Sequence, residues 1–230
     1  TARRTFIKNI AVAGAAFSII PSSSLFGKEK DGKVRLGFIG VGLRGQNHVE
    51  QALYRSDTEV VAICDIKQNM IDDTLALFSK QNKPKPQVIM DGPYGYKKLL
   101  ELKDIDAVII ATPWEWHTIQ CMDAMRAGKY VGCEVITGTT LDECWQLVHT
   151  SEQTGMPLMM LENVCYRRDV MAVLNMVRQN LFGELIHLQG GYQHDLREVK
   201  FNDGKVCGQA STSFLVSSTL VSSGCVGLIP

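Results

Sequence analysis

The sequence has no excess of charge of either sign. Its 230 residues carry 24 Lys and Arg against 24 Asp and Glu. A nucleic-acid-binding domain normally has a clustered positive charge that neutralises phosphates. The balanced charge therefore argues against nucleic acid as a partner, while a hydrophobic content of 45% is enough for a packed core.

Paired cysteine motifs are also missing. The seven cysteines are an odd number and contain no CxxC pair, so we predict neither a disulfide framework nor a structural metal site. Most of them lie in apolar runs, where cysteine acts as a small buried hydrophobe. The apolar stretch at 10–20 has 11 residues, whereas a membrane-spanning helix needs about 20. We predict no membrane span.

Residues 1–31 have the pattern of a targeting segment rather than of a folded element. Arg3 and Arg4 precede the apolar stretch, and Pro21 with three serines follows it. This order resembles a twin-arginine (Tat) signal, although Ala2 stands where such signals usually have Ser or Thr. The alternative is a basic tail before an amphipathic helix, but the stretch is apolar on all sides. We therefore expect the Tat machinery to carry the folded protein to the periplasm or the exterior.

The segment 33–65 organises the rest of the chain. A short apolar run is followed by a glycine turn, a helical segment to about Tyr54 and a second apolar run that ends in Asp65; the turn reads Gly40-Val41-Gly42-Leu43-Arg44-Gly45. In such a pattern the first glycine permits the tight turn, the second admits a pyrophosphate and the third lets the helix pack closely. The phosphates would lie at the helix N-terminus. Asp65 is placed to bind the adenosine ribose hydroxyls and to repel a 2′-phosphate, which favours NAD over NADP.

A GxGxxG pattern alone is a weak signal, because glycine turns are common. Here the strand, helix, second strand and acid follow one another in the required order, which favours a dinucleotide site over a purely structural turn. Arg44 is either solvated or in contact with the phosphates or the nicotinamide side of the cofactor, and a nearby pyrophosphate favours contact.

The remaining pattern up to residue 162 alternates helices with buried strands. It predicts helices at 69–80, 94–102, 118–127 and 141–154, a connecting loop at 81–93, and strands at 107–112, 130–133 and 158–161. This alternation predicts an α/β fold, a Rossmann doubly wound parallel sheet over 32–162, which binds ligands at the carboxyl ends of its strands.

One cluster follows the predicted strand 107–112, and we expect it to line the cofactor crevice; it consists of Pro113, Trp114, Glu115, Trp116 and His117. The alternatives are helix-start packing for the two tryptophans and a satisfied hydrogen bond for His117. Position and composition together favour the crevice.

Beyond residue 162 the pattern predicts the start of a second, incomplete α+β domain. A helix is expected at 169–180, with Val170, Val173, Leu174 and Val177 in the core, and a strand at 183–192. From residue 206 the chain has no charged residue and no periodicity. We interpret 163–205 as a partial substrate domain and 206–230 as an atypical, disordered tail left by truncation or by a frame shift near Lys205; an apolar strand pair is the alternative.

With these residues assembled, the chain resembles the glucose-fructose oxidoreductase/inositol dehydrogenase superfamily, and within it glycoside hydrolase family 109, the NAD-dependent α-N-acetylgalactosaminidases. The resemblance extends to about Asn202, and its most specific segments are TPWEWH (112–117), YVGCEV (130–135), LDECWQLV (141–148), MMLENVCYRRD (159–169) and GGYQHD (190–195). It implies that NAD is contacted by Leu43, Arg44, Asp65, Trp114, Glu115, Trp116, His117, Glu134, Val135 and Asn163. It also implies that Tyr192 contacts the substrate.

The resemblance also implies a reaction. Hydride leaves C3 of a terminal N-acetylgalactosamine for NAD, the C2 proton is removed, the C1 substituent is eliminated, water adds and the hydride returns. Sugar dehydrogenases of the superfamily have a proton-transferring lysine where this chain has Val135; the glycosidase branch has Glu-Val-Pro there, and Ile136 departs from the proline.

The family's Tyr-Pro-Thr-His segment does not occur in this sequence, so we assign no catalytic residue, and expect the missing groups in a C-terminal part. Two alternatives stay open: an NAD-dependent sugar dehydrogenase, and a non-catalytic NAD-binding fragment. Members of the superfamily often form homo-oligomers through the sheet of the second domain.

Overall fold

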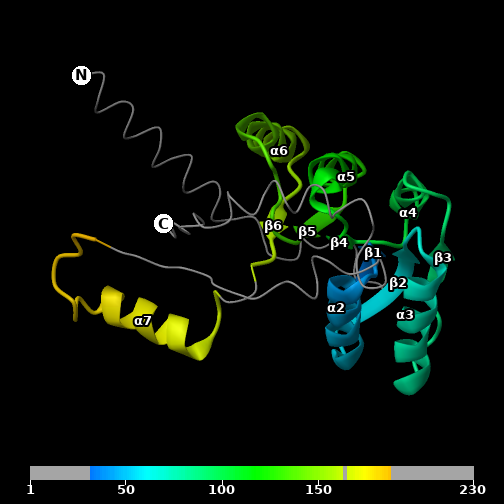
Figure 1. Ribbon diagram of the computed structural model, residues 1–230, viewed down its shortest axis with the longest axis horizontal. Coiled ribbons are helices and arrows are strands. Elements are labelled where there is room, and N and C mark those ends of the chain that lie inside the picture. The colour runs from blue at the N-terminus through cyan, green and yellow to red at the C-terminus, as the bar shows by residue number, and fades with distance from the viewer. Residues whose placement is uncertain (1–31, 163–164, 188–230) are drawn as a thin grey trace, which may run out of the picture.

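The computed structural model describes residues 32–162 and 165–187, and its main body is a six-stranded parallel sheet (Figure 1). The strands are β1 (Val34–Ile39), β2 (Thr58–Cys64), β3 (Gln87–Ile89), β4 (Ala107–Ile110), β5 (Tyr130–Cys133) and β6 (Leu158–Met160). They lie in the order β3-β2-β1-β4-β5-β6, and each neighbouring pair is parallel. This is the strand order of the Rossmann doubly wound fold, as the sequence predicts.

Helices cover both faces of this sheet. They are α2 (Leu43–Tyr54), α3 (Gln68–Lys80), α4 (Tyr96–Leu100), α5 (Trp114–Arg126) and α6 (Leu141–Thr154). α2 and α3 lie on one face, whereas α4, α5 and α6 lie on the other (Figure 1). Each face has its own apolar core, with Phe38 and Phe78 in the first and Tyr96 and Met125 in the second. Because both faces are covered, the strands are almost continuously apolar.

Three of the cysteines belong to these cores. Cys64, Cys121 and Cys133 are buried, which confirms their expected role as small hydrophobes. Cys144, by contrast, is exposed on α6. None of the described helices is long and apolar enough to cross a membrane.

Within residues 32–162 the structure differs from the predicted elements mainly at two places. The segment 81–93 contains the short strand β3, which pairs with β2 at the edge of the sheet. Its three residues follow Pro86, and an edge strand tolerates proline at its start, so a proline-rich segment hides it. Helix α5 begins at Trp114 rather than at 118, because Pro113 serves as its N-cap residue.

The helix α7 (Arg168–Arg178) has the predicted span but not the predicted packing. None of its residues is buried, and Val173 is 52% exposed. The expected core role of Val170, Val173, Leu174 and Val177 is therefore wrong, since the apolar stripe has no described element over it. Figure 1 shows α7 apart from the sheet. Residues 183–187 form no strand, and the rest of the predicted strand 183–192, the segment 1–31 and the tail 206–230 lie outside the described residues.

Candidate functional site

The turn between β1 and α2 has the shape that the three glycines predict. Gly40 has a φ of +85°, a left-handed conformation that glycine adopts without strain. A Cβ on Gly45 would lie 2.1 Å from the carbonyl oxygen of Gly40, so only glycine lets α2 approach the turn this closely. No atom lies within 4 Å of a Cβ built on Gly42. The space in front of α2 is thus open to a ligand.

The start of α2 leaves its backbone donors available. Gly42 is the N-cap residue and offers no side-chain cap, and the first turn contains no acidic residue. The first N–H groups of a helix have no partner within it and carry a partial positive charge. Together with the open space at Gly42, these donors fit a pyrophosphate.

Asp65 lies at the carboxyl end of β2, where the sequence places the ribose-binding acid. Its Oδ2 accepts a hydrogen bond from Val41 N at 2.8 Å, and its Oδ1 accepts one from Lys67 N at 2.9 Å. Each carboxylate oxygen can accept a second bond. The carboxylate therefore ties the glycine turn to β2 and keeps acceptor capacity for ribose hydroxyls; that contact stays a prediction.

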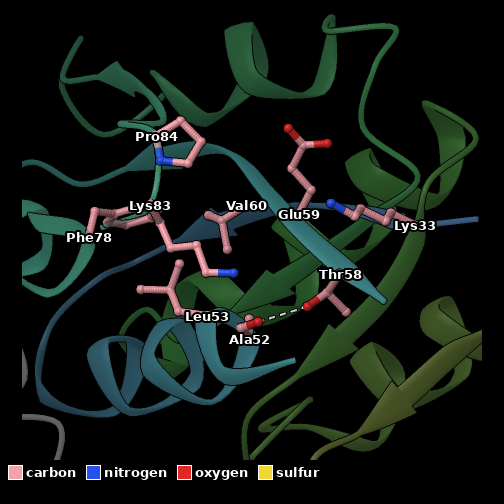
Figure 2. Close-up of a pocket in the computed structure, with 9 residues that line it drawn as sticks. All are labelled: Lys33, Ala52, Leu53, Thr58, Glu59, Val60, Phe78, Lys83 and Pro84. Carbon is pink, nitrogen blue, oxygen red and sulfur yellow. Dashed lines mark hydrogen bonds between the residues drawn. The ribbon is translucent and has the colours of Figure 1, made fainter. Parts of the chain in front are cut away.

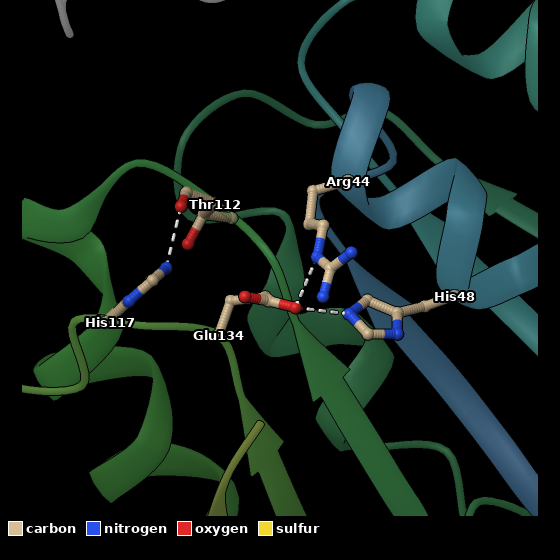
Figure 3. Close-up of polar contacts among 5 residues, drawn as sticks. All are labelled: Arg44, His48, Thr112, His117 and Glu134. Carbon is tan, nitrogen blue, oxygen red and sulfur yellow. Dashed lines mark hydrogen bonds and ion pairs between the residues drawn. The ribbon is translucent and has the colours of Figure 1, made fainter. Parts of the chain in front are cut away.

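A second carboxylate, Glu134, lies directly after β5 and joins two side chains of α2 (Figure 3). Its Oε1 is 2.6 Å from Arg44 Nε and 2.6 Å from His48 Nε2. Burial raises the pKa of Glu134, but the hydrogen bonds from His48 and Arg44 and their charges outweigh burial and hold this pKa below its ordinary value. The carboxylate is therefore charged at neutral pH. The sequence predicts Arg44 through the glycine turn and Glu134 through the family resemblance, whereas its one signal for His48 is the spacing of one helical turn from Arg44.

His117 is buried, with only 1% of the residue exposed. Its Nδ1 is 2.6 Å from the carbonyl oxygen of Ile136, and its Nε2 is 2.7 Å from that of Thr112 (Figure 3). The ring thus joins the loop after β4 to the loop after β5. The role that the structure shows for His117 is to connect these two loops. Its contact with NAD stays a prediction.

The other predicted residues differ in exposure. Leu43 and Glu115 are exposed, while Trp114, Trp116 and Val135 are half-buried. The ring of Trp116 meets that of Tyr94 edge to face, with a centroid distance of 5.4 Å. Asn163 and Tyr192 lie outside the described residues.

Within 32–162 and 165–187 no group of His, Cys, Asp and Glu is arranged to hold a metal ion.

A cavity of about 90 Å³ lies at the end of the sheet where the strands begin (Figure 2). It is lined by Lys33 and Thr58, which precede β1 and begin β2, together with Lys83 and Pro84 after α3. These are the amino ends of the strands. The cavity is therefore separate from the candidate site, which lies at the carboxyl ends.

This geometry defines a dinucleotide-binding Rossmann domain. Residues 34–162 match the model of the oxidoreductase family with an NAD-binding Rossmann fold, and residues 166–219 match that of the glycosyl hydrolase 109 C-terminal domain. The chain belongs to this oxidoreductase family, whose model names NAD as the cofactor of the Rossmann domain. Its residues 166–219 are in addition similar to the C-terminal domain of glycosyl hydrolase 109. The second match continues past Lys205, where the tail was predicted to begin.

Two relatives support this assignment. A protein of Stenotrophomonas maltophilia named glycosyl hydrolase family 109 protein is 51% identical over 204 residues, which cover 88% of this chain and 44% of that protein. A protein of Tannerella forsythia named α-N-acetylgalactosaminidase is 47% identical over 220 residues, which cover 88% of this chain and 47% of that protein. The chain spans about half the length of these relatives.

Solved structures agree on the fold. The scyllo-inositol dehydrogenase of Lactobacillus casei, solved with NAD(H) and scyllo-inositol, superposes with a TM-score of 0.58 at 19% identity. The match covers 66% of this chain and 43% of that one. At this identity the similarity concerns the fold alone.

Proposed function

We propose that this protein acts as an NAD-dependent glycosidase that hydrolyses terminal α-linked N-acetylgalactosamine from glycans or glycosides. The observation that carries the proposal is the 47% identity with the α-N-acetylgalactosaminidase of Tannerella forsythia over 220 residues. The sequence identity with this relative is well above the identity with the inositol dehydrogenases, which share the fold at about 20% sequence identity. The substrate class therefore follows the glycosidase relatives.

The described residues supply the cofactor site for this reaction. Bound NAD supplies an acceptor and donor of hydride, so that the sugar is oxidised and reduced again without net redox change. The glycine turn and the N-terminus of α2 would hold the pyrophosphate, Asp65 would accept hydrogen bonds from the adenosine ribose, and Glu134 would present a charged carboxylate from the loop after β5. We assign no proton-transferring group for the sugar among the described residues.

Val135 favours the glycosidase over a sugar dehydrogenase. It follows Glu134 at the carboxyl end of β5 and is half-buried. A dehydrogenase needs a group that takes the hydroxyl proton as hydride leaves, and an isopropyl side chain cannot accept a proton. At this position the chain therefore supports binding but no proton transfer.

The test uses p-nitrophenyl α-N-acetylgalactosaminide with and without added NAD⁺. We expect release of nitrophenol without accumulation of NADH, and no release from the matching α-galactoside. NADH formation from free N-acetylgalactosamine would instead identify a dehydrogenase. NAD binding without either reaction would identify a non-catalytic NAD-binding chain.

We also propose that the Tat machinery exports this protein to the periplasm or the exterior. Arg3 and Arg4 before the apolar stretch at 10–20 support this proposal, as does the need to acquire NAD before export, since this route carries folded proteins. Exchange of both arginines for lysine should retain the protein in the cytoplasm, as measured by cell fractionation. Equal export of the exchanged form would refute the proposal.

A further inference from the structure

His48 and Arg44 reach the same carboxylate from one helix. They are four positions apart on α2, so their side chains lie on the same face of the helix. Glu134 follows β5, which is two strands away from β1 in the sheet. The His48–Glu134 contact joins residues 86 positions apart. The cluster of Arg44, His48 and Glu134 thus bridges the carboxyl edge of the sheet where its strand order reverses.

Both contacts of this cluster fall on Oε1 of Glu134. Among the described residues no donor lies on Oε2, and the one enclosed side-chain polar atom without a hydrogen bond is Oγ1 of Thr137. Oε2 is therefore not an enclosed atom and has some access to solvent. A carboxylate held at one oxygen by two donors presents its other oxygen in a defined direction, as an acceptor for a hydroxyl group.

The two donors differ in how firmly they are held. The Arg44 side chain is 40% exposed, and only its Nε is bonded to Glu134. One of its terminal nitrogens points away from that oxygen (Figure 3) and can bind an anion such as phosphate. The His48 side chain is 23% exposed and shorter. A ligand phosphate that draws Arg44 away would still leave Oε1 bonded to His48.

We propose that His48 is a positioning residue of the cofactor site, which holds Oε1 of Glu134 so that Oε2 faces bound NAD. This role requires an N–H donor at the position of Nε2 and a carboxylate at residue 134. It rests on NAD binding and not on the glycosidase reaction, so a chain that binds NAD but releases no sugar leaves it intact.

The test measures the Kd for NAD of the full chain by titration calorimetry. His48→Ala and His48→Leu should raise Kd about tenfold, because the hydrogen bond to a charged group is lost. His48→Gln, whose side-chain amide reaches the same place, should stay within about twofold of the wild type. His149→Ala is the matched control, since His149 lies exposed on α6 and pairs with Glu152.

A double-mutant cycle separates positioning from packing. In a Glu134→Gln background, His48→Ala should change Kd by less than about twofold, because the carboxylate that it positions is gone. The proposal is overturned if His48→Ala binds NAD as the wild type does, if His48→Gln is as weak as His48→Leu, or if the tenfold loss persists in the Glu134→Gln background. If the alanine variant does not fold, the comparison of glutamine with leucine decides alone.

Discussion

The carboxylate of Asp65 accepts a hydrogen bond from the backbone N–H of Val41 at 2.8 Å, across 24 positions of the chain. Because Asp65 also accepts one from Lys67 N, Asp65→Ala leaves two backbone donors without their acceptor. We expect the free energy of unfolding to fall by about 1–3 kcal/mol and the Kd for NAD to rise at least about tenfold. Urea denaturation and calorimetric titration measure the two effects.

Asp57→Asn serves as the control for Asp65. Asp57 is exposed and pairs with Arg55 on the surface, so its loss removes the same charge without touching the site. It should bind NAD as the wild type does. An Asp65→Ala variant with the wild-type NAD affinity would remove Asp65 from the cofactor site.

The glycines at positions 42 and 45 should separate binding from folding. Alanine at 45 places a Cβ 2.1 Å from the Gly40 carbonyl oxygen, so α2 must move and the protein should lose at least about 2 kcal/mol of stability. Alanine at 42 meets no atom within 4 Å and should change stability by less than about 0.5 kcal/mol, yet its methyl group occupies the space for the pyrophosphate. Thermal unfolding and NAD titration of both variants test this contrast, and equal NAD affinity of the position-42 variant and the wild type would contradict it.

The pH dependence of stability should reveal Glu134. Its pKa in the folded protein lies below the ordinary value, since the hydrogen bonds from His48 and Arg44 outweigh burial. A carboxylate with a lowered pKa contributes its full stabilisation at pH values above its unfolded pKa of about 4.3. This contribution is lost as the pH falls through the pKa of the folded state. The difference in unfolding free energy between the wild type and Glu134→Gln should therefore shrink below about pH 4.3. The unfolding free energies of both proteins are measured by urea denaturation from pH 3 to 7. A difference between them that stays constant over this range would contradict the assignment.

Lys129 should prove to be a buried structural cation. It is 7% exposed, and its Nζ donates to the carbonyl oxygens of Leu102 and Ile105, each at 2.7 Å. Burial lowers the pKa of its ammonium group. Lys129→Met leaves both carbonyls unpaired, so the unfolding free energy should fall by about 2 kcal/mol. Lys80→Met, on the exposed end of α3, is the control and should unfold at the wild-type temperature.

Local pattern predicts most of the sheet. β1 and β5 coincide with the apolar runs 34–39 and 130–133, because strands buried on both faces need uninterrupted apolar side chains. β3 escapes the same argument, since three residues at a sheet edge carry too little periodicity, and their pairing with β2 is decided by the tertiary fold. The stripe on α7 shows the reverse case: the spacing predicts a buried face, but burial also requires a partner surface, and no described element supplies one.

The site residues likewise fall into those that a local motif predicts and those that only the tertiary fold brings together. Gly40, Gly45 and Asp65 follow one motif within 26 residues, so the sequence alone places them. His48 and Glu134 are 86 positions apart, and nothing local pairs them. The one available signal is that His48 follows Arg44 by one helical turn. His117 shows that position in a motif does not determine direction, because its ring points inward to two backbone carbonyls.

The glycine turn is bonded on both flanks, through Val41 to Asp65 and through α2 to Glu134. Its conformational entropy is therefore lost during folding rather than during ligand association. A preorganised loop of this kind should admit the dinucleotide with little change in backbone order, so that amide hydrogen exchange at the bonded N–H groups of Gly40 and Val41 is already slow before NAD arrives.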